Sequence, residues 1–317
     1  MARRILIGFG VDIDAVAGWL GSYGGENSVT DISRGLYAGE VGVPRLLKLF
    51  KKYNMKQTFN IPGHSLETFP KQVAQIREAG HEIGLHGYSH ENPTALTIEQ
   101  QKDILNHTYD LLTKFNNGVP PKGYVAPWCE MTAEVTELLL EKGVEWDHSH
   151  MARDSQAYYL RDEDTWNKIN YSAKAETWMK PLKRGKPTGM VELPANWYLD
   201  DMEPLMFVKS MPNMHGWVNP RDVENIWKDM FTYLYREEED FVFPITIHPD
   251  VSGHPHILLM IERFIEWVNT HENVYWVPWH EMAKEFRVKN PPPAGAVMPR
   301  GMEDTEVIAI HRDITYS

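Results

Sequence analysis

Short apolar runs alternate with segments of helical periodicity along most of the chain. The runs Ile5 to Val11 and Phe241 to Ile247 are largely apolar, which is typical of strands buried on both faces. Between such runs, apolar residues recur three or four positions apart, as on one face of a helix. The predicted strands are 5–11, 57–61, 82–85, 123–126, 144–146, 190–193, 241–247 and 274–277, and the predicted helices are 41–53, 99–115, 133–142, 220–238 and 255–271. This alternation favours a parallel sheet covered by helices, either closed into a barrel or left open.

Two regions break this pattern. Residues 18–42 hold seven glycines among polar residues, so we predict a long loop over the mouth of a site. Residues 151–187 mix aromatic and charged residues without a clear period. The segment 200–219 is also irregular, and we favour a core position over a pocket wall for its four methionines, Met202, Met206, Met211 and Met214.

The proline-rich end of the chain reads as an extension. Pro291, Pro292 and Pro293 cannot continue a helix, so we predict one catalytic domain over 1–288 and an extended arm over 289–317. Residues 307–310 either add a strand to a neighbouring subunit or form a disordered end. The arm and the many aromatic residues favour a homo-oligomer over a monomer.

Charge and cysteine content exclude several classes of partner. Lys and Arg total 32 against 44 Asp and Glu, a net charge of −12, which disfavours nucleic acid and anionic membrane surfaces as partners. Cys129 is the single cysteine, so no internal disulfide can form, and a reducing cytoplasm is the expected location. The apolar start of the chain resembles a short signal sequence, but Asp12 and Asp14 interrupt it, so we predict a strand.

Chemistry-bearing residues follow several of the predicted strands. Asp12 and Asp14, the pair His86 and His90, Pro127 with Trp128, and His248 each come at the carboxyl end of a different strand. In parallel β/α architectures these ends share one face, so distant residues converge there. Two neutral imidazoles and one carboxylate can hold a divalent metal and leave a position open for water, as in catalytic zinc sites.

Each of these residues also has a structural interpretation. With 14 histidines in 317 residues, chance gives roughly 0.6 pairs at the spacing of His86 and His90, so the pair alone is weak evidence. Asp12 could cap a strand end, and His248 could be a buried histidine with satisfied hydrogen bonds. Trp19 and Trp128 are either pocket walls or ordinary buried aromatics. His64, His254 and His256 are interpreted as loop residues, and Cys129 as inert packing.

Four motifs resemble the polysaccharide deacetylase family. They are Val11-Asp12-Ile13-Asp14, His86-Gly87-Tyr88-Ser89-His90, Ala126-Pro127-Trp128 and Ile245-Thr246-Ile247-His248-Pro249. The resemblance covers about residues 4–288 and is nearest to the branch with Helicobacter-type peptidoglycan deacetylases, cyclic imide hydrolases and allantoinase-like proteins. It implies an α/β fold, an irregular seven-stranded (β/α) barrel. It also implies that Asp14, His86 and His90 bind the metal, that Asp12 is the catalytic base, and that His248 is the catalytic acid.

The chain departs from the family pattern at two positions. Ile13 separates two aspartates that are usually adjacent, so the strand end must bend for both to face a pocket. Val125 stands where the family has an arginine that holds the base, so Asp12 lacks its customary cationic partner.

The resemblance implies a metal-dependent hydrolase of non-peptide C–N bonds, of the polysaccharide or peptidoglycan N-deacetylase kind. Zn²⁺ is the expected metal, with Co²⁺, Mn²⁺ or Fe²⁺ as alternatives. Trp19, Pro127 and Trp128 are the expected substrate contacts, and a backbone N–H near Trp128 is the expected oxyanion donor. A hydrolase of small cyclic imides or ureides is the first alternative. A member of the fold that binds sugar without catalysis is the second, because the family arginine is missing.

Overall fold

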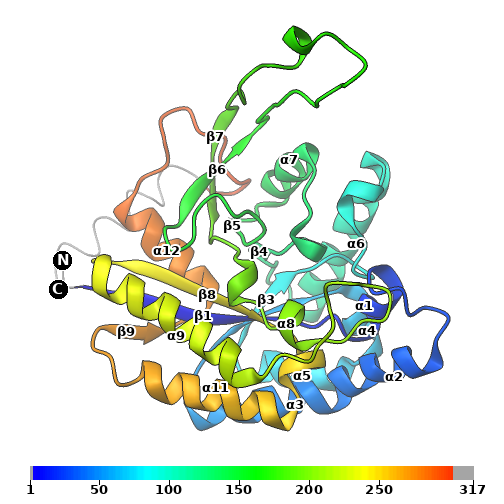
Figure 1. Cartoon of the computed structure of the whole chain (residues 1–317), viewed down its shortest axis with the longest axis vertical. Helices are drawn as coiled ribbons and strands as arrows, with labels where there is room; N and C mark the ends of the chain where they lie inside the picture. The colour runs from blue at the N-terminus through cyan, green and yellow to red at the C-terminus, as the bar shows by residue number, and fades with distance from the viewer. Residues whose placement is uncertain (1–2, 303–317) are drawn as a thin grey trace.

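The computed structural model describes residues 3–302 and shows one curled, mixed sheet surrounded by helices (Figure 1). Seven parallel strands follow the spatial order β7, β5, β4, β3, β2, β1, β8, with β6 antiparallel at the edge and β9 beside the start of β1. The strands are β1 (Ile5–Asp12), β2 (Thr58–Ile61), β3 (Glu82–Leu85), β4 (Gly123–Tyr124), β5 (Trp146–Asp147), β6 (Tyr158–Asp162), β7 (Lys186–Glu192), β8 (Phe241–Ile247) and β9 (Val274–Trp276). The predicted α/β barrel is confirmed, in the form of an open, distorted half-barrel.

The helices begin and end where local chemistry requires it. Thr97 and Gln100 form a reciprocal capping box at the start of α6, and Gly143, with φ of 73°, ends α7. The longer helices are α2 (Val29–Tyr37), α3 (Val43–Lys52), α5 (Pro70–Glu78), α6 (Ile98–Phe115), α7 (Ala133–Lys142), α9 (Pro220–Glu237), α11 (Pro255–Val268) and α12 (Trp279–Lys289). The shorter ones are α1 (Ala15–Gly21), α4 (Gly63–Thr68), α8 (Met202–Leu205) and α10 (Pro249–Ser252). Across the described residues, every helix is too short or too polar to cross a bilayer.

The alternation of side chains along β1 separates two faces of the sheet. Ile5, Ile7, Phe9 and Val11 belong to the large core that the outer helices cover, whereas Leu6 belongs to a second, inner cluster with Trp146 and Trp279. Gly8 and Gly10 share the inner face with Leu6. A Cβ at Gly10 would lie 2.0 Å from the Trp279 ring, so this glycine makes room for α12 inside the half-barrel. Asp12 continues the inner series at the end of the strand.

Most of the glycine-rich segment 18–42 is helical, and only residues 22–28 form the predicted loop. It forms the end of α1, then α2, then one π-helical turn, η1 (Ala38–Gly42), which runs directly into α3. Several of its glycines are packing positions. A Cβ at Gly35 would lie 2.6 Å from the backbone nitrogen of Val16, and one at Gly39 would lie 2.5 Å from the Phe69 ring. For the helical part the prediction was wrong because close helix contacts, rather than turns, require these glycines.

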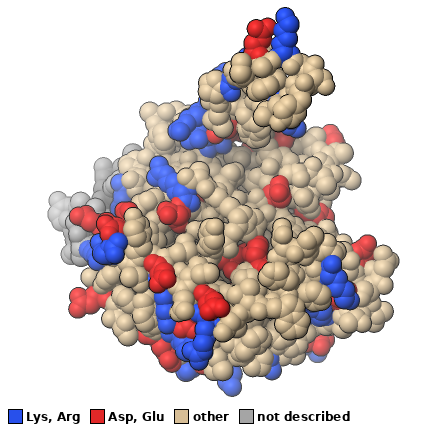
Figure 2. Space-filling view, viewed as in Figure 1, with Lys and Arg blue, Asp and Glu red and all other residues tan. Residues whose placement is uncertain are grey.

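The aperiodic region 151–187 contains β6 and the start of β7, joined by an arm that stands clear of the rest of the molecule (Figures 1 and 2). The arm exposes several large apolar side chains, Trp166, Ile169, Tyr171, Met179 and Leu182. In the segment 200–219, Met202, Met206 and Met214 are buried as predicted, and Met211 is partly buried.

The first residues of the extension pack on the body of the chain. Val297 pairs with Thr188 in a parallel bridge, and the Arg300 N–H donates to Leu140 O. The strand considered for residues 307–310 lies outside the described residues. The division into 1–288 and 289–317 stays a prediction.

Candidate active site

The carboxyl ends of β1, β3 and β8 bring five candidate residues to one buried pocket. Asp12 ends β1, His86 follows β3, and His248 follows β8, while Asp14 and His90 lie in the segments just beyond β1 and β3. All five side chains are at most 5% exposed and line the same cavity of about 30 Å³. The convergence predicted from strand order is therefore present in the structure.

The chain bends sharply between Asp12 and Ala15, as the intervening Ile13 requires. The Ile13 N–H donates to Asn60 O at 3.0 Å, which keeps Asp12 in the sheet. Ala15 then adopts a left-handed conformation, with φ of 45°, and its N–H donates to Asp250 Oδ2 at 3.1 Å. An alanine with positive φ is strained, so the Asp250 contact helps to hold this turn and directs Asp14 inward.

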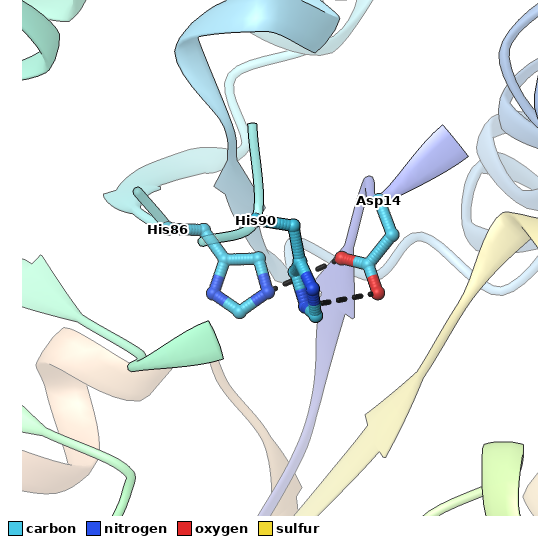
Figure 3. Close-up of side chains that lie close together, drawn as sticks. All are labelled: Asp14, His86 and His90. Atoms are coloured by element: carbon cyan, nitrogen blue, oxygen red, sulfur yellow. Dashed lines mark ion pairs between the residues drawn. The ribbon is translucent and has the colours of Figure 1, made fainter. Parts of the chain in front are cut away.

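The Asp14 carboxylate faces both imidazoles, with one oxygen directed at each ring (Figure 3). Its Oδ1 is 3.2 Å from His86 Nε2, and its Oδ2 is 3.3 Å from His90 Nε2. His86 Nδ1 donates to Val125 O at 2.7 Å. The Ser22 hydroxyl donates its one hydrogen to His90 O at 2.6 Å. Ser22 Oγ must therefore accept the hydrogen bond from His90 Nδ1, which lies 2.6 Å away. In its neutral form each histidine therefore presents an Nε2 lone pair to a carboxylate. Burial lowers the pKa of His86, but Asp12 and Asp14 outweigh it and raise the pKa above its ordinary value.

This arrangement fits a divalent metal. Lone pairs facing a carboxylate repel it unless a proton or a metal cation lies between them, and Asp14 Oδ1 and His86 Nε2 are both buried without a hydrogen-bond partner among the described residues. The three donor atoms lie within 4.8 Å of one another. Burial, helped by His86 and His248, lowers the pKa of His90 to about 4, so this imidazole is neutral, as a ligand must be. Two nitrogens and one oxygen form the ligand set of many catalytic zinc sites.

Asp12 lies beside these candidate ligands. Asn60 Nδ2 donates to Asp12 Oδ1 at 2.7 Å, and Asp12 Oδ2 lies 3.7 Å from His86 Nε2. Burial raises the pKa of Asp12, and the Asp14 carboxylate raises it further, against the opposing effect of the nearby histidines. Val125 packs in the inner apolar cluster. Asn60 thus supports Asp12 with a neutral amide, a role that the sequence analysis missed, although an amide inside an apolar strand could have indicated it.

His248 is held by a second buried carboxylate. Its Nδ1 donates to Asp201 Oδ1 at 2.7 Å, its backbone N–H also donates to Asp201, and the Ser252 hydroxyl donates to Asp201 Oδ2. His248 Nε2 faces the pocket, 3.7 Å from Asp14 Oδ2. Burial lowers the pKa of His248, but Asp200, Asp201 and Asp14 outweigh it and raise the pKa well above its ordinary value. Asp201 was missed, although the acidic pair 200–201 marked it.

Trp128 lines the pocket, but the other two predicted substrate contacts do not. Trp19 is 2% exposed and packs edge-on against Tyr23. Pro127 is buried and lines a separate apolar cavity behind the pocket. Both placements argue against substrate contact, because each ring fills the core. Tyr23, which the sequence analysis missed, donates its hydroxyl hydrogen to Asp14 Oδ2.

A wide groove continues from the small pocket to the surface. It has a volume of about 740 Å³ and shares Trp128, Trp197 and Glu203 with the pocket. Trp128 has a left-handed backbone conformation, with φ of 60°. The Cys129 N–H donates a hydrogen bond to Ala126 O. The groove offers aromatic surface next to the candidate ligands, which suits a substrate larger than the inner pocket.

Comparison with known proteins gives consistent results. A family model described as polysaccharide deacetylase matches residues 36–163. The chain is 56% identical to the peptidoglycan deacetylase of Helicobacter pylori over 92% of this chain and 99% of that protein. It is 40% identical to the peptidoglycan deacetylase-like protein FGM2 of Gibberella zeae, over 92% of this chain and 89% of that protein.

Solved structures share the fold. A putative polysaccharide deacetylase from Mycobacterium smegmatis superposes with a TM-score of 0.76 at 26% identity, covering 91% of this chain and 92% of that one. Puue allantoinase superposes with a TM-score of 0.72 at 22% identity, covering 91% of this chain and 92% of that one. At that identity the second likeness concerns the fold alone.

Proposed function

Because this chain belongs to the polysaccharide deacetylase family and is a hydrolase of non-peptide C–N bonds, we propose that Asp14, His86 and His90 hold its catalytic metal. Asp12 is the general base in this proposal, and His248 is the general acid. The observation that carries it is the pair of Nε2 lone pairs directed at one buried carboxylate. Zn²⁺ is the proposed ion, with Co²⁺, Mn²⁺ and Fe²⁺ as alternatives that the same ligands accept.

The residues divide the reaction between them. A bound divalent ion supplies Lewis acidity, polarising the amide carbonyl and lowering the pKa of the attacking water toward ~7. Asp12 Oδ2 takes the proton of that water while Asn60 holds Asp12 Oδ1. The Trp128 N–H is the proposed backbone donor to the developing oxyanion. His248 then protonates the leaving nitrogen from Nε2, and Asp201 stabilises the charged imidazolium through Nδ1.

We propose an N-acetylated sugar within a glycan chain as the substrate. Two relatives are named for peptidoglycan deacetylation, and the groove beside the pocket has room for sugars that flank the reacting one. Trp197 is 40% exposed and lies in both linings, so its ring can contact a sugar face. A small cyclic imide would fill the inner pocket and leave the groove unused.

The test is hydrolysis by metal-loaded protein of two substrate panels. N-acetylated oligosaccharides and peptidoglycan glycan should release acetate, and cyclic imides and ureides should stay intact. His90→Ala should abolish acetate release. His64→Ala is the matched control, because His64 lies outside the pocket lining, and this variant should retain the activity. Turnover of imides without acetate release would overturn the glycan assignment, and full activity of His90→Ala would overturn the metal assignment.

Assembly and location remain proposals of the same kind. The apolar side chains exposed on the arm support a homo-oligomer, because burial against another copy removes them from water. A single monomeric species in sedimentation analysis would contradict it. The proposed cytoplasmic location is tested by fractionation of cells that express the full chain.

A further inference from the structure

A second group of potential metal ligands lies outside the site described above. Asp147 ends β5, Glu192 ends β7, and His150 lies in the loop after β5. His150 Nδ1 is 3.1 Å from Asp147 Oδ2 and 3.5 Å from Glu192 Oε2. Ligand atoms around a tetrahedral Zn²⁺ lie roughly 3.3 Å apart, given bonds of about 2.0–2.1 Å. The spacing also matches the 3.2 and 3.3 Å contacts of Asp14 with His86 and His90.

This group lies on the opposite face of the sheet from the catalytic pocket. Val191 and Trp146 point into the inner cluster, so their neighbours in sequence, Glu192 and Asp147, point outward. Met190, two residues before Glu192, belongs to the outer core and confirms that direction. The two carboxylates therefore lie outside the lining of the catalytic pocket.

The two carboxylates form a buried pair that is costly to ionise fully: burial and the neighbouring Asp147 raise the pKa of Glu192 well above its ordinary value. Asp147 and Glu192 are directly paired in the register of β5 and β7, and both side chains are fully buried. Like charges opposite each other on neighbouring strands destabilise a sheet, and burial without compensation increases the cost. A protonated His150 supplies one positive charge, whereas a divalent ion supplies two.

One ligand atom, Glu192 Oε2, is buried with only the 3.5 Å contact to His150 Nδ1 and no hydrogen bond among the described residues. Glu192 Oε1 accepts the N–H groups of Ser149 and His150, at 3.1 and 3.0 Å, and Asp147 Oδ1 accepts the Ser149 hydroxyl at 2.8 Å. Glu192 Oε2 is buried without a hydrogen-bond partner among the described residues and lies on the side of His150 Nδ1. Asp14 Oδ1 is in the same state in the first site. An oriented, unpaired carboxylate oxygen beside an imidazole nitrogen is an arrangement that a cation completes.

We propose that Asp147, His150 and Glu192 form a second site for a divalent cation of the Zn²⁺ or Mn²⁺ class, separate from the catalytic one. The ion joins β5, β7 and the loop after β5. His150 is 37% exposed, so the ion enters and leaves along this side chain. Ser149 Oγ also accepts the Ala126 N–H at 2.9 Å, so the site supports the segment that leads to Trp128.

The experiment counts bound metal rather than activity. Full-length protein is stripped with a chelator, dialysed to equilibrium against Zn²⁺, and analysed for zinc per chain. Wild type should bind two ions, His150→Ala one, Asp14→Ala one, and the double variant none. His280→Ala is the matched control and should bind two. His280 is similarly exposed and lies 3.1 Å from Glu82, but it belongs to no three-ligand group among the described residues.

Glu192→Gln keeps the shape of the side chain and should also bind one ion, so it carries the test if His150→Ala fails to fold. Added Zn²⁺ should raise the Tm of Asp14→Ala but not that of the double variant. One ion in wild type, lost in Asp14→Ala and kept in His150→Ala, would overturn the second site and leave the proposed function intact. One ion lost in His150→Ala and kept in Asp14→Ala would support the second site and remove the metal from the proposed mechanism.

Discussion

The two proposed metal-binding groups have similar donors but different surroundings. Asp14, His86 and His90 lie on the inner face of the sheet, in a pocket that continues into a wide groove. Asp147, His150 and Glu192 lie on the outer face, where backbone N–H groups already occupy Glu192 Oε1. Beside the inner group lie the Asp12 carboxylate and the His248 imidazole, which bind no metal in our proposal. The ligand spacing of both groups fits a metal ion, whereas catalysis also needs free proton-transfer groups and access for substrate.

The largest expected difference between the groups is in turnover. Asp14→Ala should lower kcat/KM for acetate release roughly 10⁴-fold, because both the ion and its Lewis acidity are lost. His150→Ala should lower it less than about tenfold, because it acts at a distance through Ser149 and Ala126. Steady-state acetate assays on both variants check this, and equal losses would remove the distinction between the two groups.

Proton transfer should be specific to the inner group. His248→Asn should lower kcat about 10²- to 10³-fold, the usual contribution of a general acid. Asp201→Asn removes one of the carboxylates that raise the pKa of His248, so the alkaline limb of the kcat profile should move to lower pH. The pH profile of Asp201→Asn measures this shift, and a limb that stays in place would exclude His248 as the acid.

Substrate access through the groove should also distinguish the inner group from the outer one. Trp197→Ala should raise KM for long N-acetylated oligosaccharides about fivefold, for a lost ring contact of about 1 kcal/mol. The KM for a monosaccharide amide should change little, because that substrate does not reach the groove. An equal effect on both substrates would show that Trp197 acts on the pocket rather than on the chain of sugars.

The smallest effect should come from the link between the two groups. Ser149→Ala removes a hydroxyl that donates to Asp147 and accepts the Ala126 N–H. Both hydrogen bonds are buried. The expected loss is about 1–2 kcal/mol of unfolding free energy, or a few degrees in Tm. Thermal unfolding checks it, and an unchanged Tm would show that the link contributes nothing to stability.

Much of the fold could be predicted from periodicity, because its strands are continuous apolar runs. The strand 241–247 and the helix 133–142 were predicted with the observed bounds. The segment 18–42 failed because its glycines serve packing between helices, which a local pattern cannot distinguish from turns.

The five central site residues could be predicted from motif order, and the structure brings them together. Their supporting contacts were harder to predict, since Ser22 and Tyr23 carry no spacing signal and Asn60 is marked only as an amide inside an apolar strand. Asp201 lies 47 residues from His248 and meets it only through the curl of the sheet. Trp19 and Pro127, which lie outside the pocket lining, show the same limit, because sequence does not reveal which way a ring faces.

The central claim is that the inner group binds the ion on which catalysis depends. Its most direct test is a titration of metal-free protein with Zn²⁺, in which bound zinc and acetate release are measured together for wild type and Asp14→Ala. The account predicts that wild-type activity rises with the ion that Asp14→Ala fails to bind, and that this variant stays inactive at every zinc concentration. Full acetate release by metal-free wild type, or by zinc-loaded Asp14→Ala, would contradict it.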